Sequence, residues 1–370
     1  MKNKYGLDLE KAVFVIDSPV TAFMVSILSE GCPVNIVLER KIELETDRAS
    51  ELLLNFVRSC INIGTMKKVQ LPHRFYISGK DLGKIWNIRQ QTRNLYDTYP
   101  DETIFVGAST STFMRGLRCN PQNIIFLHHG LGDLTKKEDE SKSFGTLKGK
   151  LRRIIIGKIM GLPHSIWCSF WPEKAFSLCK LKSTDERWLN LYDFESNTIK
   201  KKLDFIETFN DEKSNVLFFP VIEGHTKDGV ASDVTSFDDF NYNFLSKYID
   251  SDKDRVFVKY HPWLYRANDN TRSNLIQLLL HKGIEAYDIA SMVPDSIGGV
   301  LLPTEVICRY AKIDKMISRD TSTMWYLSGN NQIEKIIDIT QASDDYYKHM
   351  LHFIDELKIK SYSDDIKFYI

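Results

Sequence analysis

Short apolar runs alternate with helical patterns along most of the chain. Residues 12–16 (AVFVI) form an apolar run rich in β-branched side chains, and a helical pattern follows at 21–30, after the loop Asp17-Ser18-Pro19. This order of strand, tight loop and helix is the first step of a βαβ unit. The same reasoning predicts strands at 34–38, 69–71, 103–106 and 124–127, and helices at 49–63 and 80–96.

A second series of the same kind follows residue 212. It predicts strands at 216–219, 256–258, 299–302 and 315–318, and helices at 239–248 and 273–282. Strands that alternate with helices indicate a parallel sheet covered on both faces. Because 183–212 is charged and less periodic, the boundary is expected there. The prediction is an α/β protein with two Rossmann-like domains facing a central cleft: residues 1–195, residues 213–345, and a C-terminal helical segment at 346–370.

Composition narrows the class of protein. The chain has 370 residues, 43% of them hydrophobic, and 49 basic residues balance 49 acidic ones. Zero formal charge gives no global basic field of the kind that binds nucleic acid. The six cysteines are scattered without a CxxC pair, which favours free thiols in a reducing compartment over disulfides or zinc. We read no signal peptide and no run of about eighteen apolar residues. A cytoplasmic protein is expected.

One basic stretch suggests a partner. Residues 144–160 (FGTLKGKLRRIIIGKIM) interleave lysine and arginine with isoleucine and leucine. The stretch fits a segment packed on the core equally well as a basic amphipathic helix that meets anionic lipid. On the second interpretation the protein would be peripheral on the inner membrane.

Polar, chemically capable segments follow several of the predicted strands. Open α/β sheets bind ligands at the carboxyl ends of their strands, so these segments are candidates for one site. Taken singly, each has a structural explanation: Thr321-Ser322-Thr323 suits a helix N-cap, and Glu305 suits the first turn of a helix. The segments are Asp17-Ser18-Pro19, Gly107-Ala108-Ser109-Thr110, His128-His129-Gly130, Lys259-Tyr260-His261-Pro262, Pro303-Thr304-Glu305 and Arg319-Asp320-Thr321-Ser322-Thr323.

Several common chemistries lack their sequence motifs. The chain has no GxxxxGK[ST] loop, no GxGxxG fingerprint, no compact metal triad and no GxSxG elbow. No metal and no tightly bound cofactor are therefore expected. A hydroxyl-rich helix start such as Thr321-Ser322-Thr323 also suits an anion, because free N–H groups and the helix dipole favour phosphate.

Three of these segments, in order, resemble a known family. Lys259-Tyr260-His261-Pro262, then Pro303-Thr304-Glu305, then Asp320-Thr321-Ser322-Thr323 resemble the HP motif, P-x-E segment and Ser/Thr pair of bacterial sialyltransferases and polysialyltransferases of the GT-B fold. The strand that leads into Ser18-Pro19 also looks like their first strand and loop. The similarity spans much of the chain, although each motif is short.

The resemblance implies a role for each matching residue. His261 would contact the phosphate of a CMP-sugar and assist its departure, with Lys259 beside it. Glu305, in the segment begun by Pro303, would bind the cytidine ribose. Thr321, Ser322 and Thr323 would hold the phosphate. The reaction would invert the anomeric centre without a metal.

The catalytic base departs from the family pattern. Where those enzymes carry two acidic residues before a glycine, this chain has His128-His129-Gly130. Histidine serves well as a general base, because its ordinary pKa lies near neutrality. Of the two, His129 is preferred, with His128 as the alternative. Ser18, Gly130 and Asp133 are candidates on the acceptor side, and Asp133 is a second candidate base.

The function expected from the sequence is therefore an inverting glycosyltransferase. It would move sialic acid, or a related nonulosonic acid, from a CMP-sugar to a surface glycan such as a capsule polysaccharide or lipooligosaccharide. A histidine before glycine also resembles the CDP-glycerol glycerophosphotransferases, so a CDP-polyol phosphotransferase is the alternative. A non-catalytic protein that binds a nucleotide or a glycan is the alternative from another class.

Overall fold

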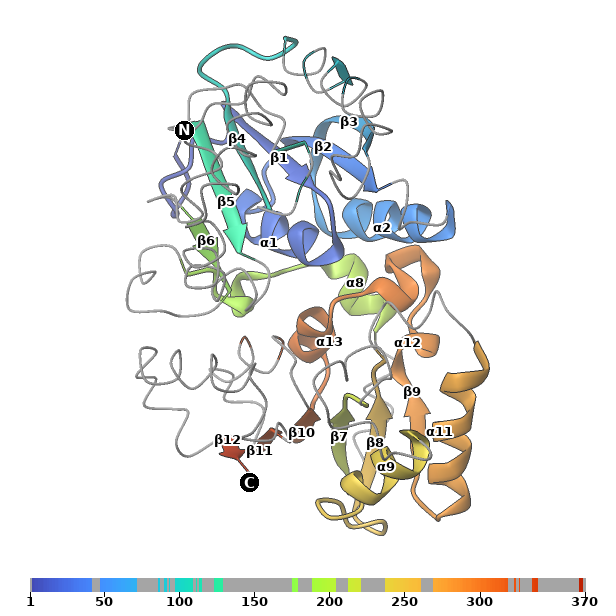
Figure 1. Cartoon of the computed structure of the whole chain (residues 1–370). Helices are drawn as coiled ribbons and strands as arrows, with labels where there is room; N and C mark the ends of the chain where they lie inside the picture. Colours follow the sequence, from blue (N-terminus) through green and yellow to red (C-terminus); the bar gives the residue numbers. More distant parts are fainter. Residues whose placement is uncertain are drawn as a thin grey trace, which may run out of the picture. The chain divides into compact units, whose positions relative to one another are not determined.

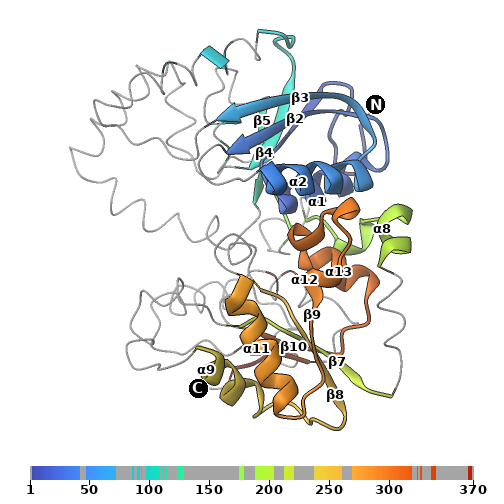
Figure 2. The same cartoon turned by 90° about the vertical axis from the view of Figure 1, so that its right-hand side faces the viewer.

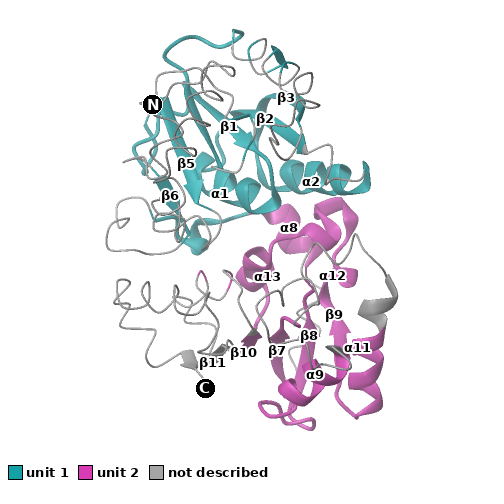
Figure 3. Cartoon of the chain, viewed as in Figure 1, with its two compact units in different colours: residues 1–195 teal, residues 196–370 magenta. Residues whose placement is uncertain are grey.

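The computed structural model divides the chain into two compact units, Met1–Glu195 and Ser196–Ile370 (Figure 3). The described residues are 2–41, 47–71, 86, 90–91, 93, 97–108, 111, 113–114, 123–128, 175–178, 188–203, 212–220, 237–260, 269–318, 323, 326, 335–338 and 366–368.

Unit 1 is built on a six-stranded parallel sheet with the order β3-β2-β1-β4-β5-β6 (Figure 1). Helices α1 and α2 lie side by side and belong to the first two crossovers. The elements are β1 (Ala12–Ile16), α1 (Pro19–Ser29), β2 (Val34–Lys41), α2 (Asp47–Cys60), β3 (Ile63–Leu71), β4 (Ile104–Ala108), β5 (Ile124–His128), β6 (Ala175–Ser177) and the 3₁₀ helix η4 (Leu191–Asp193).

Helix α1 shows why the N-terminal sequence folds this way. Ser18, in extended conformation, accepts a hydrogen bond from the Thr21 amide, and Pro19 occupies the first turn, where no N–H is needed. The helix is buried from Thr21 to Ser29, which is why its sequence is apolar nearly all round. It ends where Glu30 takes a left-handed conformation with φ of 50°.

Unit 2 has a second six-stranded parallel sheet, β12-β11-β10-β7-β8-β9. Helices α9 and α11 lie side by side and pack their apolar side chains with β7, β8 and β9 into one core (Figure 2). The elements are α8 (Asn197–Lys202), β7 (Ser214–Phe218), α9 (Phe237–Leu245), β8 (Asp254–Val258), α11 (Asp269–His281), β9 (Ala286–Asp288), α12 (Ile289–Met292), η7 (Asp295–Ile297), η8 (Gly299–Leu301), α13 (Thr304–Tyr310), β10 (Lys315–Ser318), β11 (Lys335–Asp338) and β12 (Ile366–Phe368).

The two units share one strand topology. In each, the first strand lies between the second and the fourth, so that the order in sequence is 3-2-1-4-5-6. This is the doubly wound Rossmann order, which confirms the predicted α/β class with two Rossmann-like sheets. The order in which strands are added to the sheet reverses between β1 and β4 in unit 1, and between β7 and β10 in unit 2, although all of these strands are parallel. Ligands of such sheets bind outside the carboxyl ends of the strands at these switch points.

Three secondary-structure predictions differ from the structure by more than a small shift of bounds. The strand predicted at 69–71 begins at Ile63, and the helix predicted at 49–63 ends at Cys60. Residues 299–302, predicted as a strand, are a 3₁₀ turn, because Gly298 and Gly299 take positive φ angles of 112° and 52° that break an extended run. The third strand of unit 2 is instead the short β9. The segment 346–370, expected to be helical, is described only at Ile366–Phe368, which pair with β11 as a strand.

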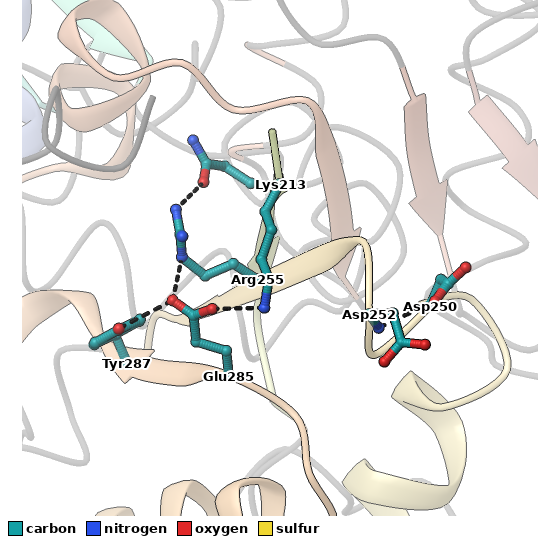
Figure 4. Close-up of polar contacts among 7 residues, drawn as sticks. Lys213, Asp250, Asp252, Arg255, Glu285 and Tyr287 are labelled. Atoms are coloured by element: carbon teal, nitrogen blue, oxygen red, sulfur yellow. Dashed lines mark hydrogen bonds and ion pairs between the residues drawn. The ribbon is translucent and has the colours of Figure 1, made fainter. Parts of the chain in front are cut away.

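The amino edge of the unit 2 sheet carries a polar network (Figure 4). The Glu285 carboxylate accepts hydrogen bonds from Lys213, at 2.8 Å, from Arg255 and, at 3.0 Å, from the Tyr287 hydroxyl. Next to it, buried Asp254 at the start of β8 pairs with Lys315 at 2.7 Å. These contacts tie together the beginnings of β7, β8, β9 and β10, so their role is structural.

Candidate functional site

The carboxyl edge of the unit 2 sheet holds a buried lysine. Lys259 follows β8 directly, and its amide donates to the Phe218 carbonyl at 2.9 Å, which continues the ladder to the end of β7. The side chain is 3% exposed, and Nζ donates to the Val300 carbonyl at 3.3 Å. Burial lowers the pKa of Lys259 to about 8, although Asp288 and Glu305 act in the opposite direction.

A buried glutamate belongs to the same cluster. Glu305 lies in the first turn of α13, is 3% exposed and accepts a hydrogen bond from Thr323 Oγ1 at 3.0 Å. Burial raises its pKa, and the bond from Thr323 and the charge of Lys259 offset part of that rise. Asp288, at the end of β9, caps α12 by accepting from the Ala290 amide at 3.0 Å.

Several residues predicted from the sequence therefore meet in unit 2. Lys259 comes from the end of β8, Pro303 and Glu305 from the start of α13, and Thr323 from the segment after β10. The electrostatic interaction between Lys259 and Glu305 links the first two of these segments, and the hydrogen bond that Thr323 donates to Glu305 links the third. His261, Thr321 and Ser322 lie outside the described residues.

The corresponding edge of unit 1 is acidic and rich in hydroxyl groups. Asp17 is 2% exposed and accepts from Thr21 Oγ1 at 2.8 Å, while the Ser18 hydroxyl lies 2.7 Å from that of Thr21. Ser18, a predicted acceptor-side residue, is the N-cap of α1 in this structure. Neither Asp17 by itself nor Thr21 was among the residues predicted for the site. The position of Asp17, between a buried strand and the N-cap Ser18, could have indicated it.

The candidate base is only partly covered by the structure. His128 is the last residue of β5, lies opposite Ser177 of β6 and is buried. His129, Gly130 and Asp133 lie outside the described residues, as does the basic stretch 144–160. The choice among His129, His128 and Asp133 therefore stays a prediction.

A second buried glutamate, Glu39 of unit 1, was not predicted from the sequence. Glu39 of β2 is fully buried, and its Oε2 accepts from Ser111 Oγ at 2.6 Å and from the Phe113 amide at 3.1 Å. Ser111 Oγ in turn accepts from the Met114 amide at 3.0 Å. Glu39 lies in VNIVLERK, where the charged end of a strand looks solvated, so its burial is not expected from the sequence.

The described residues contain no metal-ligand cluster: no group of three or more of their His, Cys, Asp or Glu side chains is placed to hold a metal ion. Within the same residues, no helix is both long and apolar enough to cross a membrane.

Comparisons with known proteins add no assignment. The sequence matches no model of a known protein family, and no curated protein matches it. The residues at the carboxyl ends of the strands in the two units are therefore the basis for assigning a function.

Proposed function

We propose that the protein is a glycosyltransferase that takes a CMP-activated nonulosonic acid, such as sialic acid, as donor and a glycan as acceptor. The observation that supports it most is the cluster of Lys259, Glu305 and Thr323 at the carboxyl edge of unit 2. Three separate segments contribute to it, and it lies at the edge where Rossmann sheets bind nucleotides. Two Rossmann-like units in one chain suit the GT-B arrangement, in which donor and acceptor occupy different units.

The chemistry of the cluster suits a nucleoside monophosphate. Lys259 supplies positive charge in a desolvated setting, where its attraction for a phosphate is stronger than in water. Glu305 offers a carboxyl oxygen to the ribose hydroxyls. Ser322 supplies its hydroxyl and amide donors to the phosphate, and Thr323 supplies its amide, since the Thr323 hydroxyl donates to Glu305. His261, from the HP motif, contacts the same phosphate as it leaves.

These groups account for the bond that forms, the bond that breaks and the proton that is transferred. The acceptor hydroxyl oxygen attacks the anomeric carbon of the sugar, and the bond from that carbon to the phosphate oxygen of CMP breaks. CMP departs with the bonding electrons, and Lys259 and His261 stabilise its charge. The acceptor proton passes to the base, for which His129 is preferred over His128 and Asp133. Attack opposite the leaving group inverts the anomeric centre.

The proposal is tested with a donor panel. Release of CMP is measured from CMP-sialic acid and related CMP-nonulosonic acids, alongside CDP-glycerol and UDP-sugars. We expect turnover, or slow hydrolysis, with a CMP-sugar. Turnover of CDP-glycerol alone would establish the polyol phosphotransferase instead, and a response to UDP-sugars alone would overturn the cytidine assignment. Binding of CMP without any turnover of these donors would favour a binding protein.

A matched pair of variants places the donor site. Glu305→Ala should weaken CMP binding by about 10- to 100-fold, the range expected for loss of a hydrogen bond to a charged group. Glu212→Ala removes an exposed glutamate of the same unit and should leave binding unchanged. Equal CMP affinity in both variants, measured by calorimetry, would remove Glu305 from the site.

A further inference from the structure

Glu39 in unit 1 occupies the position that Lys259 occupies in unit 2. The last registered pair between the first two strands is Ile16 with Leu38 in unit 1, and Phe218 with Val258 in unit 2. The next residue along the second strand is Glu39 in one unit and Lys259 in the other. Both side chains are buried, so equivalent points of two related sheets carry an acidic residue in one unit and a basic residue in the other.

The segments after the fourth strands are also related. Thr110-Ser111-Thr112 follows β4 in the sequence, and Thr321-Ser322-Thr323 follows β10, so the same three residue types come after both fourth strands. In unit 2 the proposed function assigns the donors of this segment to a phosphate. In unit 1, Glu39 Oε2 accepts from Ser111 Oγ and from the Phe113 amide.

The end of β4 packs closely against β1. A side chain at Gly107 would bring its Cβ within 2.8 Å of Val15 Cβ, its register partner in β1, and within 3.0 Å of Met114 Cγ. Only glycine allows β1 and Met114 to approach position 107 this closely. Ser111 and Phe113, which donate to Glu39, therefore follow a closely packed strand end.

We infer that Glu39 is a positioning residue that acts as an internal anion at the switch point of unit 1. Its carboxylate takes the donors that a phosphate would otherwise take, and it fixes Ser111 and Phe113 in place. The unit 1 edge is thereby closed to a nucleotide and kept for an uncharged, hydroxyl-bearing group, the glycan acceptor. The acceptor part of this inference rests on the proposed function, whereas the positioning part stands on the geometry of unit 1.

The first test measures the segment itself. Hydrogen–deuterium exchange of the peptide that contains Phe113 and Met114 is compared in wild type, Glu39→Gln, Ser111→Ala and the control Glu51→Gln, an exposed glutamate of α2. Exchange should rise about 10- to 100-fold in the first two variants, as expected when a hydrogen bond to a charged group is lost. Exchange equal to wild type in both would overturn the positioning role.

Chemical rescue tests the anion. Formate, a small carboxylate, should return the exchange of the same peptide in Glu39→Ala toward the wild-type rate, and neutral formamide should not. Equal effects of the two additives, or no effect of formate, would contradict an internal anion. Because no catalysis is needed, both this and the exchange experiment remain decisive if the proposed transferase activity fails.

Kinetics separate the two substrates. In Glu39→Gln, kcat should fall and KM for the acceptor should rise, each about tenfold, while CMP affinity stays within twofold of wild type. A merely structural role would move both substrates together. A loss of CMP affinity as large as in Glu305→Ala would place Glu39 in the nucleotide site and overturn the inference.

Discussion

Glu285 and Glu305 lie at opposite edges of the same sheet and respond in opposite ways to their surroundings. Burial acts to raise the pKa of Glu285, but hydrogen bonds from Lys213, Arg255 and Tyr287 prevail and lower it. Burial also acts on Glu305, and there it prevails, because the Thr323 hydroxyl and the charge of Lys259 offset it only in part. The first carboxylate is stabilised by its neighbours, whereas the second is held where its charge is costly.

This difference in pKa distinguishes the structural network at the amino edge from the candidate site at the carboxyl edge. At the amino edge, oppositely charged side chains from different strands pair with one another, as Asp254 of β8 does with Lys315 of β10 at 2.7 Å. At the carboxyl edge, Lys259 bonds to a carbonyl group and Glu305 to a hydroxyl group, and both have pKa values moved toward the neutral form. Perturbed groups of this kind gather at functional sites.

The largest effect is expected at the amino edge. Arg255→Met should lower the free energy of unfolding by about 2–3 kcal/mol, because Glu285 and Asn215 lose a buried partner while Lys213 still holds Glu285. Lys253→Met, at an exposed site, is the control. Urea denaturation measures both, and CMP affinity should not change. An equally stable Arg255→Met protein would remove the structural role of this edge.

At the carboxyl edge, substitution should affect binding more than stability. Lys259→Met removes a buried charge and keeps most of the side-chain volume, so stability should stay level or rise by about 1 kcal/mol. CMP affinity should fall about 10- to 100-fold. Calorimetry and urea denaturation of the same preparation check both expectations. A strong loss of stability with unchanged CMP affinity would make the two edges alike.

The pH dependence follows from the pKa of Lys259, which is about 8 in the folded chain against 10.5 for an ordinary lysine. CMP affinity should fall as pH rises above 8, approaching about tenfold per unit, because the uncharged amine no longer attracts the phosphate. Between pH 8 and 10.5 the unfolded chain binds more protons, so the contribution of Lys259 to stability rises with pH. Lys259→Met should lose both dependences, and an identical pH profile in the variant would refute the assignment.

The sequence predicted the sheets better than the contacts. Apolar runs such as Ala12–Ile16 indicated β1, and the alternation of runs with helical patterns indicated parallel sheets. Strand β9 was missed because Ala286–Asp288 is only three residues long and has a polar end. Short strands of this kind are stabilised by their neighbours in the sheet rather than by their own residues.

In the candidate site, too, individual residues were predictable from the sequence and the contacts between them were not. Motif spacing singled out Lys259 and Glu305, but the bond from Thr323 to Glu305 joins residues 18 positions apart and depends on how β10 and α13 are placed. The contact of Glu39 with Ser111 spans 72 positions. Such pairs depend on strand register, which the sequence pattern alone does not specify.

The smallest effects come from a matched pair of substitutions that compares the two edges directly. Glu285→Gln should cost about 1 kcal/mol at pH 7, since a partly exposed carboxylate with a lowered pKa loses charged partners. Glu305→Gln should be neutral or slightly stabilising at pH 7, because the amide resembles the protonated form that burial favours. A raised pKa makes stability fall as pH rises above 4.5, and a lowered one makes stability fall as pH drops below 4.5. Both differences from wild type should therefore shrink as the pH is lowered far enough to protonate both carboxylates, as thermal unfolding across that range will measure. Changes of the same sign in both variants at pH 7 would show that the two edges do not differ in this way.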